Sequence, residues 1–194
     1  VLPMIYAPRL DRCGPRPSGR KVPCFLLLRF KYNGGQERYG PSNEEHAVSA
    51  PLRSAKIADI VEYYYDVDRH GGIFGDSKLV DLVTRVRPDL IVLSSYSPFS
   101  RKSTRFEVLK AIRSKCHVPI VLMWSDSGQK SAISSCSYML DVVDLHIEGD
   151  TAKLYQHFSG KDNFLRLWPP LDFSVFHPGD ECRDIPISFV GSLR

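Results

Sequence analysis

Six short apolar runs, separated by stretches in which apolar residues recur at helical spacing, constrain this chain more than any other feature. One run, Pro88–Ser94, holds four apolar residues in a row, which is typical of a parallel strand buried on both faces. Strands that alternate with helices of about ten residues indicate parallel strands joined by crossover helices. We therefore predict an α/β fold with a doubly wound, Rossmann-like, mostly parallel sheet. The strands are expected at residues 22–30, 59–65, 88–94, 118–124, 142–147 and 164–168, and later helices at 74–86, 104–114, 129–140 and 151–158.

The first helix has a marked start and a marked interruption. Ser42-Asn-Glu-Glu45 fits a capping box, in which Ser42 is the N-cap and the Glu45 side chain reaches back to it. The helix that begins at Glu44 then meets Pro51, which lacks a backbone N–H and is expected to kink or end the helix.

Ligands of doubly wound sheets bind beyond the carboxyl ends of the strands, so the loops that follow the strands are the candidate sites. In the first of them, Gly34 and Gly35 would let backbone amides approach a ligand, and the helix behind offers its positive end to an anion. Glu37 and Arg38 lie beside these glycines. The alternative is that Asn-Gly-Gly here is only a turn. The loops considered are 31–41, 66–75, 95–103, 125–128 and 148–150.

Four further side chains are candidates for chemistry or binding. Asp126 could act as a base on an acceptor hydroxyl, or it could only cap the next helix. His46, on the first helix, is a second candidate acid or base, with polar surface as its alternative role. Ser95 and Arg101 could bind a sugar or a phosphate, or could simply face solvent.

No metal centre and no tightly bound cofactor is expected. The five cysteines never pair as Cys-x-x-Cys, so no zinc framework follows. The Asp66-Val-Asp68 string is expected to be a solvated pair at a strand end. Neither a dinucleotide fingerprint nor a P-loop is present. Asp144-Leu-His146-Ile-Glu-Gly149 matches a string found in cobalamin-binding domains, but it coincides with the fifth strand, so we interpret the match as chance.

Composition favours a cytoplasmic protein with a well-formed core. The chain has 194 residues, 43% of them hydrophobic, and no apolar run long enough to span a bilayer. Scattered cysteines are typical of a reducing compartment. The net charge of +4 is compatible with anionic ligands or with a peripheral contact to a membrane surface. Basic residues do not interleave with aromatic ones as in a nucleic-acid groove, so no nucleic acid is expected as a partner.

The last part of the chain reads as a connection between domains. Two prolines follow the sixth strand, Asp172, Phe176 and Pro178 come next, and Phe189-Val-Gly191 opens a new strand. Prolines and an aromatic side chain would make such a crossover rigid, so that two lobes can hinge about it. This spacing resembles the hinge of GT-B glycosyltransferases of the glycogen-synthase-like superfamily. Arg183-Asp-Ile185 makes the chain most similar to the spore-protein-type bacterial subgroup.

The resemblance implies four parts of the chain. They are an irregular N-terminal arm (1–21), a Rossmann-like acceptor-side domain (22–168), an interdomain linker (169–186) and the start of a truncated donor-binding domain (187–194).

The resemblance also implies metal-independent transfer of a sugar from a nucleotide-diphosphate sugar, the co-substrate, to a sugar, lipid or protein acceptor. The acceptor-side half alone is then expected to be inactive, because the C-terminal donor domain completes the site. Gly191 would lie near the donor phosphate; Ser192 stands where many relatives have an arginine, and Arg194 could substitute. Two alternatives stay open: a non-catalytic small-ligand-binding module of Rossmann-like fold, and an inactive relative of the glycosyltransferases.

Overall fold

The computed structural model of this protein describes residues 20–68, 75–94, 106–124, 131–149 and 152–167. The strands are β1 (Cys24–Arg29), β2 (Asp59–Tyr64), β3 (Leu90–Ser94), β4 (Ile120–Trp124), β5 (Leu145–Glu148) and β6 (Phe164–Arg166). Two short turns, η2 (Asn33–Gly35) and η3 (Glu37–Tyr39), precede η4 (Glu45–Ser49) and α1 (Ala50–Ala55). The later helices are α2 (Tyr65–Asp68), α3 (Gly75–Val86), α4 (Phe106–Cys116), α5 (Ala132–Met139) and α6 (Lys153–His157).

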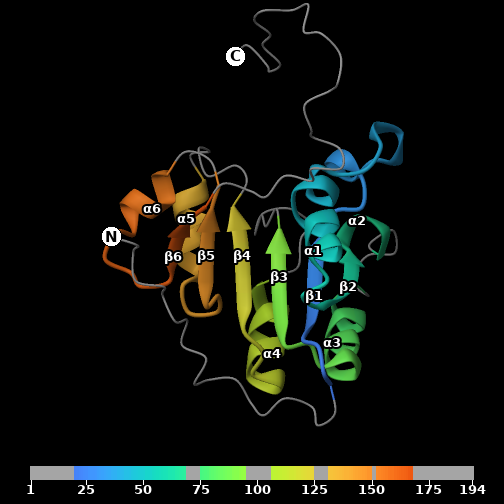
Figure 1. The fold of residues 1–194 in the computed structure, drawn as a ribbon. Helices are drawn as coiled ribbons and strands as arrows, with labels where there is room; N and C mark the ends of the chain where they lie inside the picture. The colour runs from blue at the N-terminus through green and yellow to red at the C-terminus, as the bar shows by residue number, and fades with distance from the viewer. Residues whose placement is uncertain (1–19, 69–74, 95–105, 125–130, 150–151, 168–194) are drawn as a thin grey trace, which may run out of the picture.

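The six strands form one parallel sheet in the order β2-β1-β3-β4-β5-β6 (Figure 1). The chain first steps from β1 to β2, then returns across β1 to β3 and continues outward to β6. Right-handed crossovers therefore put η4 and α1 on one face of the sheet and α3 to α6 on the other. The predicted doubly wound α/β fold is confirmed.

Each face of the sheet carries its own core. The larger core packs Leu26 and Leu28 of β1 against helices α3 to α6, where Leu79 and Ile112 are fully buried. The smaller core joins Leu27 and the neighbouring strand β3 to Val48 of η4. Figure 1 accordingly shows α1 in front of β1, and α4 and α5 behind the sheet. Alternating side chains of β1 thus serve both cores, as expected of a strand covered on both faces.

The first helix does not end at Pro51. It runs through α1 to Ala55, and the turn directly before the proline widens into the π-helical turn η4. There the Ala50 amide donates to the Glu45 carbonyl, five residues back. Proline lacks an N–H and its ring would collide with the carbonyl four residues earlier, so a wider turn lets the helix continue past it.

Ser42 and Glu45 do not form the predicted capping box. The Ser42 hydroxyl donates to the Phe30 carbonyl at 2.6 Å, and the Glu45 carboxylate binds Arg29 and Arg53 instead. Both side chains therefore tie the helix to the sheet rather than to its own first turn.

The strand expected at residues 142–147 begins later, at Leu145. Asp144, which precedes it, accepts hydrogen bonds from Arg113 of α4 and from the Ile120 amide at 2.8 Å. Asp144 thus has a structural role, which supports the interpretation that the match of residues 144–149 to the cobalamin-binding string is a coincidence.

The linker and the expected second domain, residues 169–194, lie outside the described residues. All six strands of the described sheet come from residues 24–166. No helix in the described part is long and apolar enough to cross a membrane.

Candidate functional site

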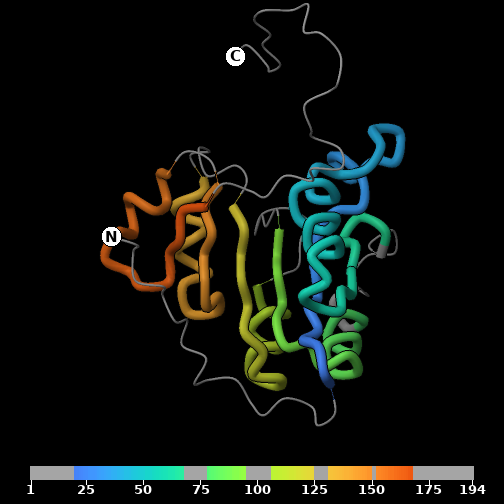
Figure 2. Tube along the Cα trace, in the orientation of Figure 1, coloured from blue at the N-terminus to red at the C-terminus, as the bar shows by residue number. Residues whose placement is uncertain are grey.

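The order of the strands reverses between β1 and β3. From β1 the chain goes to β2 on one side, whereas β3 to β6 are added one after another on the other side. In open α/β sheets a ligand binds outside the strand ends at this topological switch point. Figure 2 shows the loop after β1, in blue, at this upper edge beside η4. The candidate site is therefore the region formed by residues 29–46 and the end of β3.

The loop after β1 is closed upon itself. A bridge joins Tyr32 to Pro41, and the Asn33 amide donates to the Gly40 carbonyl at 3.0 Å. Gly34 and Gly35 have φ angles of 57° and 69°, which glycine adopts without strain. The Gly35 amide donates to the Tyr32 carbonyl at 2.9 Å, so it is used within the loop. That the loop cradles an anion stays a prediction, and any such contact would need amides other than that of Gly35.

Asp66 is buried and holds the start of the loop after β1, rather than being solvated. It is 6% exposed, and its carboxylate accepts the Lys31 and Tyr32 amides at 2.8 and 2.9 Å. The expectation of a solvated Asp66-Asp68 pair is thus wrong for Asp66, because its carboxylate binds the two amides that open the loop after β1. No metal-binding group of three or more His, Cys, Asp or Glu side chains occurs among the described residues.

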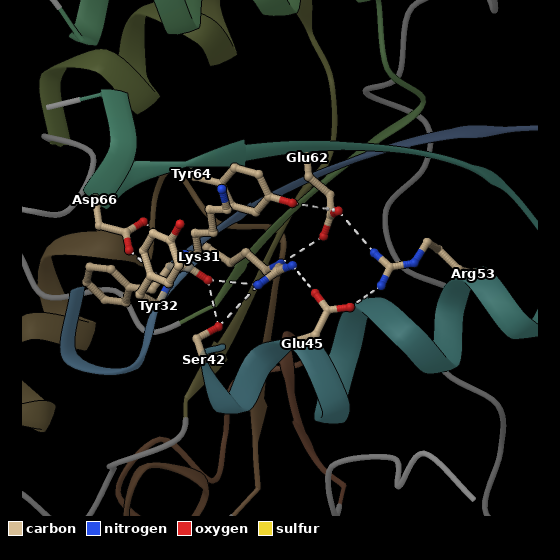
Figure 3. A network of polar contacts seen from close by, with 10 residues as sticks. Lys31, Tyr32, Ser42, Glu45, Arg53, Glu62, Tyr64 and Asp66 are labelled. Carbon is tan, nitrogen blue, oxygen red and sulfur yellow. Dashed lines mark hydrogen bonds and ion pairs between the residues drawn. The ribbon is translucent and has the colours of Figure 1, made fainter. Parts of the chain in front are cut away.

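Next to this loop, Arg29 is buried at the end of β1 in a network with Glu45, Glu62 and Arg53. Figure 3 labels these three partners. Its Nε donates to Glu62 of β2 at 2.8 Å, and its Nη2 forms an ion pair with Glu45 of η4. Arg53 of α1 pairs with the same two carboxylates from the solvent side. The network joins β1, β2 and the first helix, and so it holds in place the elements that border the candidate site.

The charges of this network are balanced by direct contacts. Burial of the Glu62 carboxylate disfavours its ionised form, but the nearby Ser49 hydroxyl and the hydrogen-bonded Arg29 guanidinium outweigh this, and the pKa of Glu62 lies below its ordinary value. The Tyr64 hydroxyl donates to Glu62 at 2.9 Å. Burial first, and then this contact with Glu62, raise the pKa of Tyr64, so the phenol stays protonated near neutral pH.

Ser94 ends β3 beside Arg29. Leu28 pairs with Leu93, so the next residues of the two strands lie opposite each other and point to the α1 side of the sheet. Ser94 is only 5% exposed, and its hydroxyl has no hydrogen-bond partner within the described ranges. A buried hydroxyl without a partner is costly, and a ligand group can supply the missing bond.

The structure brings five of the predicted site residues to this edge. Gly34, Gly35, Glu37 and Arg38 lie in the loop after β1, and His46 lies at the start of η4. Glu37 accepts the Tyr32 hydroxyl at 3.2 Å, and Arg38 donates to Tyr39 at 2.8 Å. His46 is partly buried, with its Nδ1 atom shielded from solvent.

The other predicted site residues lie outside the described part of the chain. They are Ser95, Arg101, Asp126, Gly191, Ser192 and Arg194. Their proposed roles in catalysis or in donor and acceptor binding stay predictions.

At the carboxyl end of β5, the first amides of α6 are already taken by a side chain of the protein. Glu148 is 1% exposed, and its carboxylate accepts the Leu154 and Tyr155 amides at the start of α6, at 3.1 and 2.9 Å. The chain's own carboxylate therefore takes the place that a ligand phosphate would occupy at a helix N-terminus.

Two buried groups near β5 are unsuited to catalysis. Burial lowers the pKa of His146 to about 3, and its Nδ1 accepts a hydrogen bond from Trp124 Nε1 at 3.1 Å. Burial raises the pKa of the neighbouring Cys136 to about 12, so this thiol is not a thiolate near neutral pH. Both residues are 0% exposed; Cys136 belongs to the larger core, and His146 stacks on Phe164 of that core.

Sequence reasoning missed Ser94, Arg29 and Asp66. Ser94 carried no signal beyond its place at the end of a strand. Arg29 directly after a run of leucines was a signal, because a charged residue at the end of a buried strand needs partners, but its partners lie far away in sequence.

No family model matches the chain, and no curated protein matches it. Among solved structures, the chain is similar to the signal receiver domain of a modulated diguanylate cyclase from Desulfovibrio desulfuricans G20. The identity is 13%, the match covers 70% of this chain and 89% of that chain, and the TM-score is 0.42. It is also similar to ureidoglycine-glyoxylate aminotransferase from Bacillus subtilis, with 12% identity, 66% and 29% coverage and a TM-score of 0.34. Likeness at this level carries no conclusion about function.

Proposed function

We propose that this chain is the acceptor-side lobe of a metal-independent glycosyltransferase of GT-B architecture, which uses a nucleotide-diphosphate sugar as donor. The observation that carries the proposal is the buried Ser94 hydroxyl, without a partner in the described part, at the switch point of the sheet. A sugar offers hydroxyl groups that can donate to or accept from such a group. The hinge-like spacing of residues 169–178 supports the presence of a second lobe, which a GT-B site requires.

The described site supplies binding and orientation rather than a strong acid or base. The Arg29 network joins β1, β2 and the first helix, and Asp66 fixes the start of the loop after β1. Ser94 ends β3 next to Arg29, on the α1 side of the sheet. In the proposed reaction, the donor diphosphate binds mainly to the second lobe. Positive helix ends and basic side chains stabilise the leaving phosphate.

The test is a panel of nucleotide sugars, offered with candidate acceptors to the protein encoded by the complete gene and scored by release of nucleoside diphosphate. The wild-type protein is expected to release it with at least one donor. Release with no donor would contradict an active transferase.

Variants make the test specific to the site. Ser94→Ala should lower turnover without loss of stability, because the hydroxyl makes no bond within the described protein that the substitution would break. Ser42→Ala is the matched contrast, because that hydroxyl bonds Phe30 and Arg29 and its removal should destabilise the fold. Equal turnover in Ser94→Ala and wild type would contradict the assigned role of Ser94.

A further inference from the structure

Two cations at the rim of the candidate site lie against tyrosine rings. Lys31 Nζ is 5.0 Å from the centre of the Tyr32 ring and 5.9 Å from that of Tyr64. The guanidinium carbon of Arg38 is 4.7 Å from the centre of the Tyr39 ring. Figure 3 shows Lys31, Tyr32 and Tyr64 grouped beside Asp66. We call Lys31, Tyr32, Arg38 and Tyr39 the cation–tyrosine surface.

Neither cation has an ion pair with a carboxylate among the described residues, although carboxylates lie close by. Glu37 accepts a hydrogen bond from the Tyr32 hydroxyl, and the Asp66 carboxylate accepts hydrogen bonds from two backbone amides. Lys31 and Arg38 are exposed, so their charge is offered to solvent. A cation held over an aromatic ring is positioned without being neutralised, which lowers the entropy lost when it binds an anion.

The tyrosines add an apolar contact to this charge. Tyr39 is 54% exposed, which is high for a large aromatic side chain. An aromatic ring face packs well against the C–H face of a sugar ring, and its hydroxyl can hydrogen-bond at the same time. Because the loop is bridged at its ends, Lys31 and Tyr32 at its start and Arg38 and Tyr39 near its end are presented by one closed loop.

We propose that the cation–tyrosine surface binds a carbohydrate acceptor that carries negative charge, such as a glycan with carboxylate groups. This inference rests on the proposed function and adds the substrate class. Sugar rings pack on the tyrosines, and the anionic groups pair with Lys31 and Arg38. The charge contacts weaken with salt, because both cations are exposed.

The experiment measures binding of fluorescent octagalacturonate, with maltooctaose as the neutral sugar and an oligothymidylate of equal length as the nucleic-acid probe. No nucleotide sugar is present. Octagalacturonate should bind about tenfold more tightly than maltooctaose at low salt, and high salt should remove the difference. Equal affinity for the two sugars, or tighter binding of the oligothymidylate, would overturn the inference.

Variants separate charge from stacking. Lys31→Gln and Arg38→Gln should each weaken octagalacturonate binding about fivefold and leave maltooctaose binding unchanged. Tyr39→Ala should weaken binding of both sugars. The matched control is Lys115→Gln, an exposed lysine in the last turn of α4 at the opposite edge of the sheet, which should change neither. Octagalacturonate binding that is insensitive to Lys31 and Arg38 would place the sugar elsewhere and overturn the assignment.

The outcomes distinguish this inference from the proposed function. Transfer to a neutral acceptor by a protein that does not bind octagalacturonate would overturn the inference alone. Octagalacturonate binding by a protein that releases no nucleoside diphosphate from any donor would overturn the proposed function alone.

Discussion

Replacement of Arg29 by methionine should be among the most damaging single changes at the candidate site. Arg29 is 2% exposed and binds Glu62, Glu45, Ser42 and the Phe30 carbonyl. Methionine keeps much of the length and removes the charge, so two carboxylates lose their buried partner. Breaking a buried pair from one side typically costs about 3–5 kcal/mol.

The expected loss lies at the lower end of this range, about 3 kcal/mol, because Arg53 still contacts both carboxylates. Arg53→Met is the matched control: its side chain is 42% exposed, so its loss should cost only about 0.5 kcal/mol. Urea unfolding with linear extrapolation measures both free energies. With a typical slope of about 2 kcal/mol per M, Arg29→Met should shift the midpoint down by about 1.5 M.

The effect of Arg29→Met should also depend on pH. The pKa of Glu62 is below its ordinary value of 4.5, so its contribution to stability is present above that pH and is lost as the pH falls through the lowered pKa. Without Arg29 the Glu62 carboxylate protonates more readily, and its protonation in acid reduces the destabilisation of the variant. The difference from wild type should therefore shrink below about pH 4.5. A loss no larger than that of Arg53→Met, or one independent of pH, would refute this account of the network.

Three further predictions concern the rest of the fold. Burial lowers the pKa of His146 from 6.5 to about 3, so the free energy of unfolding that depends on neutral His146 is fully present above pH 6.5 and is lost as the pH falls toward 3. His146→Phe should therefore flatten the plot of unfolding free energy against pH between these values. Gly34→Ala should cost about 1 kcal/mol because φ is 57°, whereas Gly160→Ala should cost nearly nothing, and equal losses in thermal unfolding would contradict this. Glu148→Gln should cost about 1–2 kcal/mol and speed hydrogen exchange at the first turn of α6; unchanged exchange would contradict the assigned cap.

The fold was largely predictable from the sequence because the apolar pattern of a parallel sheet is local. The run Leu90–Leu93 is typical of a strand covered on both faces, and β3 lies inside the sheet as expected. Boundaries were less exact where buried turns are as apolar as strands. Val142 and Val143 are 4% and 3% exposed, yet they precede β5, and this is why the predicted strand began too early.

The candidate site was predictable in position but not in its contacts. The switch point follows from strand order, and Gly34, Gly35, Glu37, Arg38 and His46 do lie at that edge. The polar network was not predictable, because its contacts join residues far apart in sequence.

Glu45 illustrates the limit. Its spacing from Ser42 fits a capping box, but Arg29 from the neighbouring strand binds the carboxylate instead. A tertiary ion pair that is shielded from solvent outweighs a local cap worth about 1 kcal/mol. Asp66 was misjudged for the same reason, since its partners, the Lys31 and Tyr32 amides, belong to the loop after another strand.

The most direct measurement of the central claim is hydrogen exchange across the intact protein, with and without a nucleotide sugar and an acceptor. The account predicts that added substrate slows exchange in residues 31–46 and at the end of β3, while the opposite edge near residues 113–119 keeps its rate. Protection confined to that opposite edge, with no change around Ser94, would contradict a reaction site at the carboxyl ends of β1 and β3.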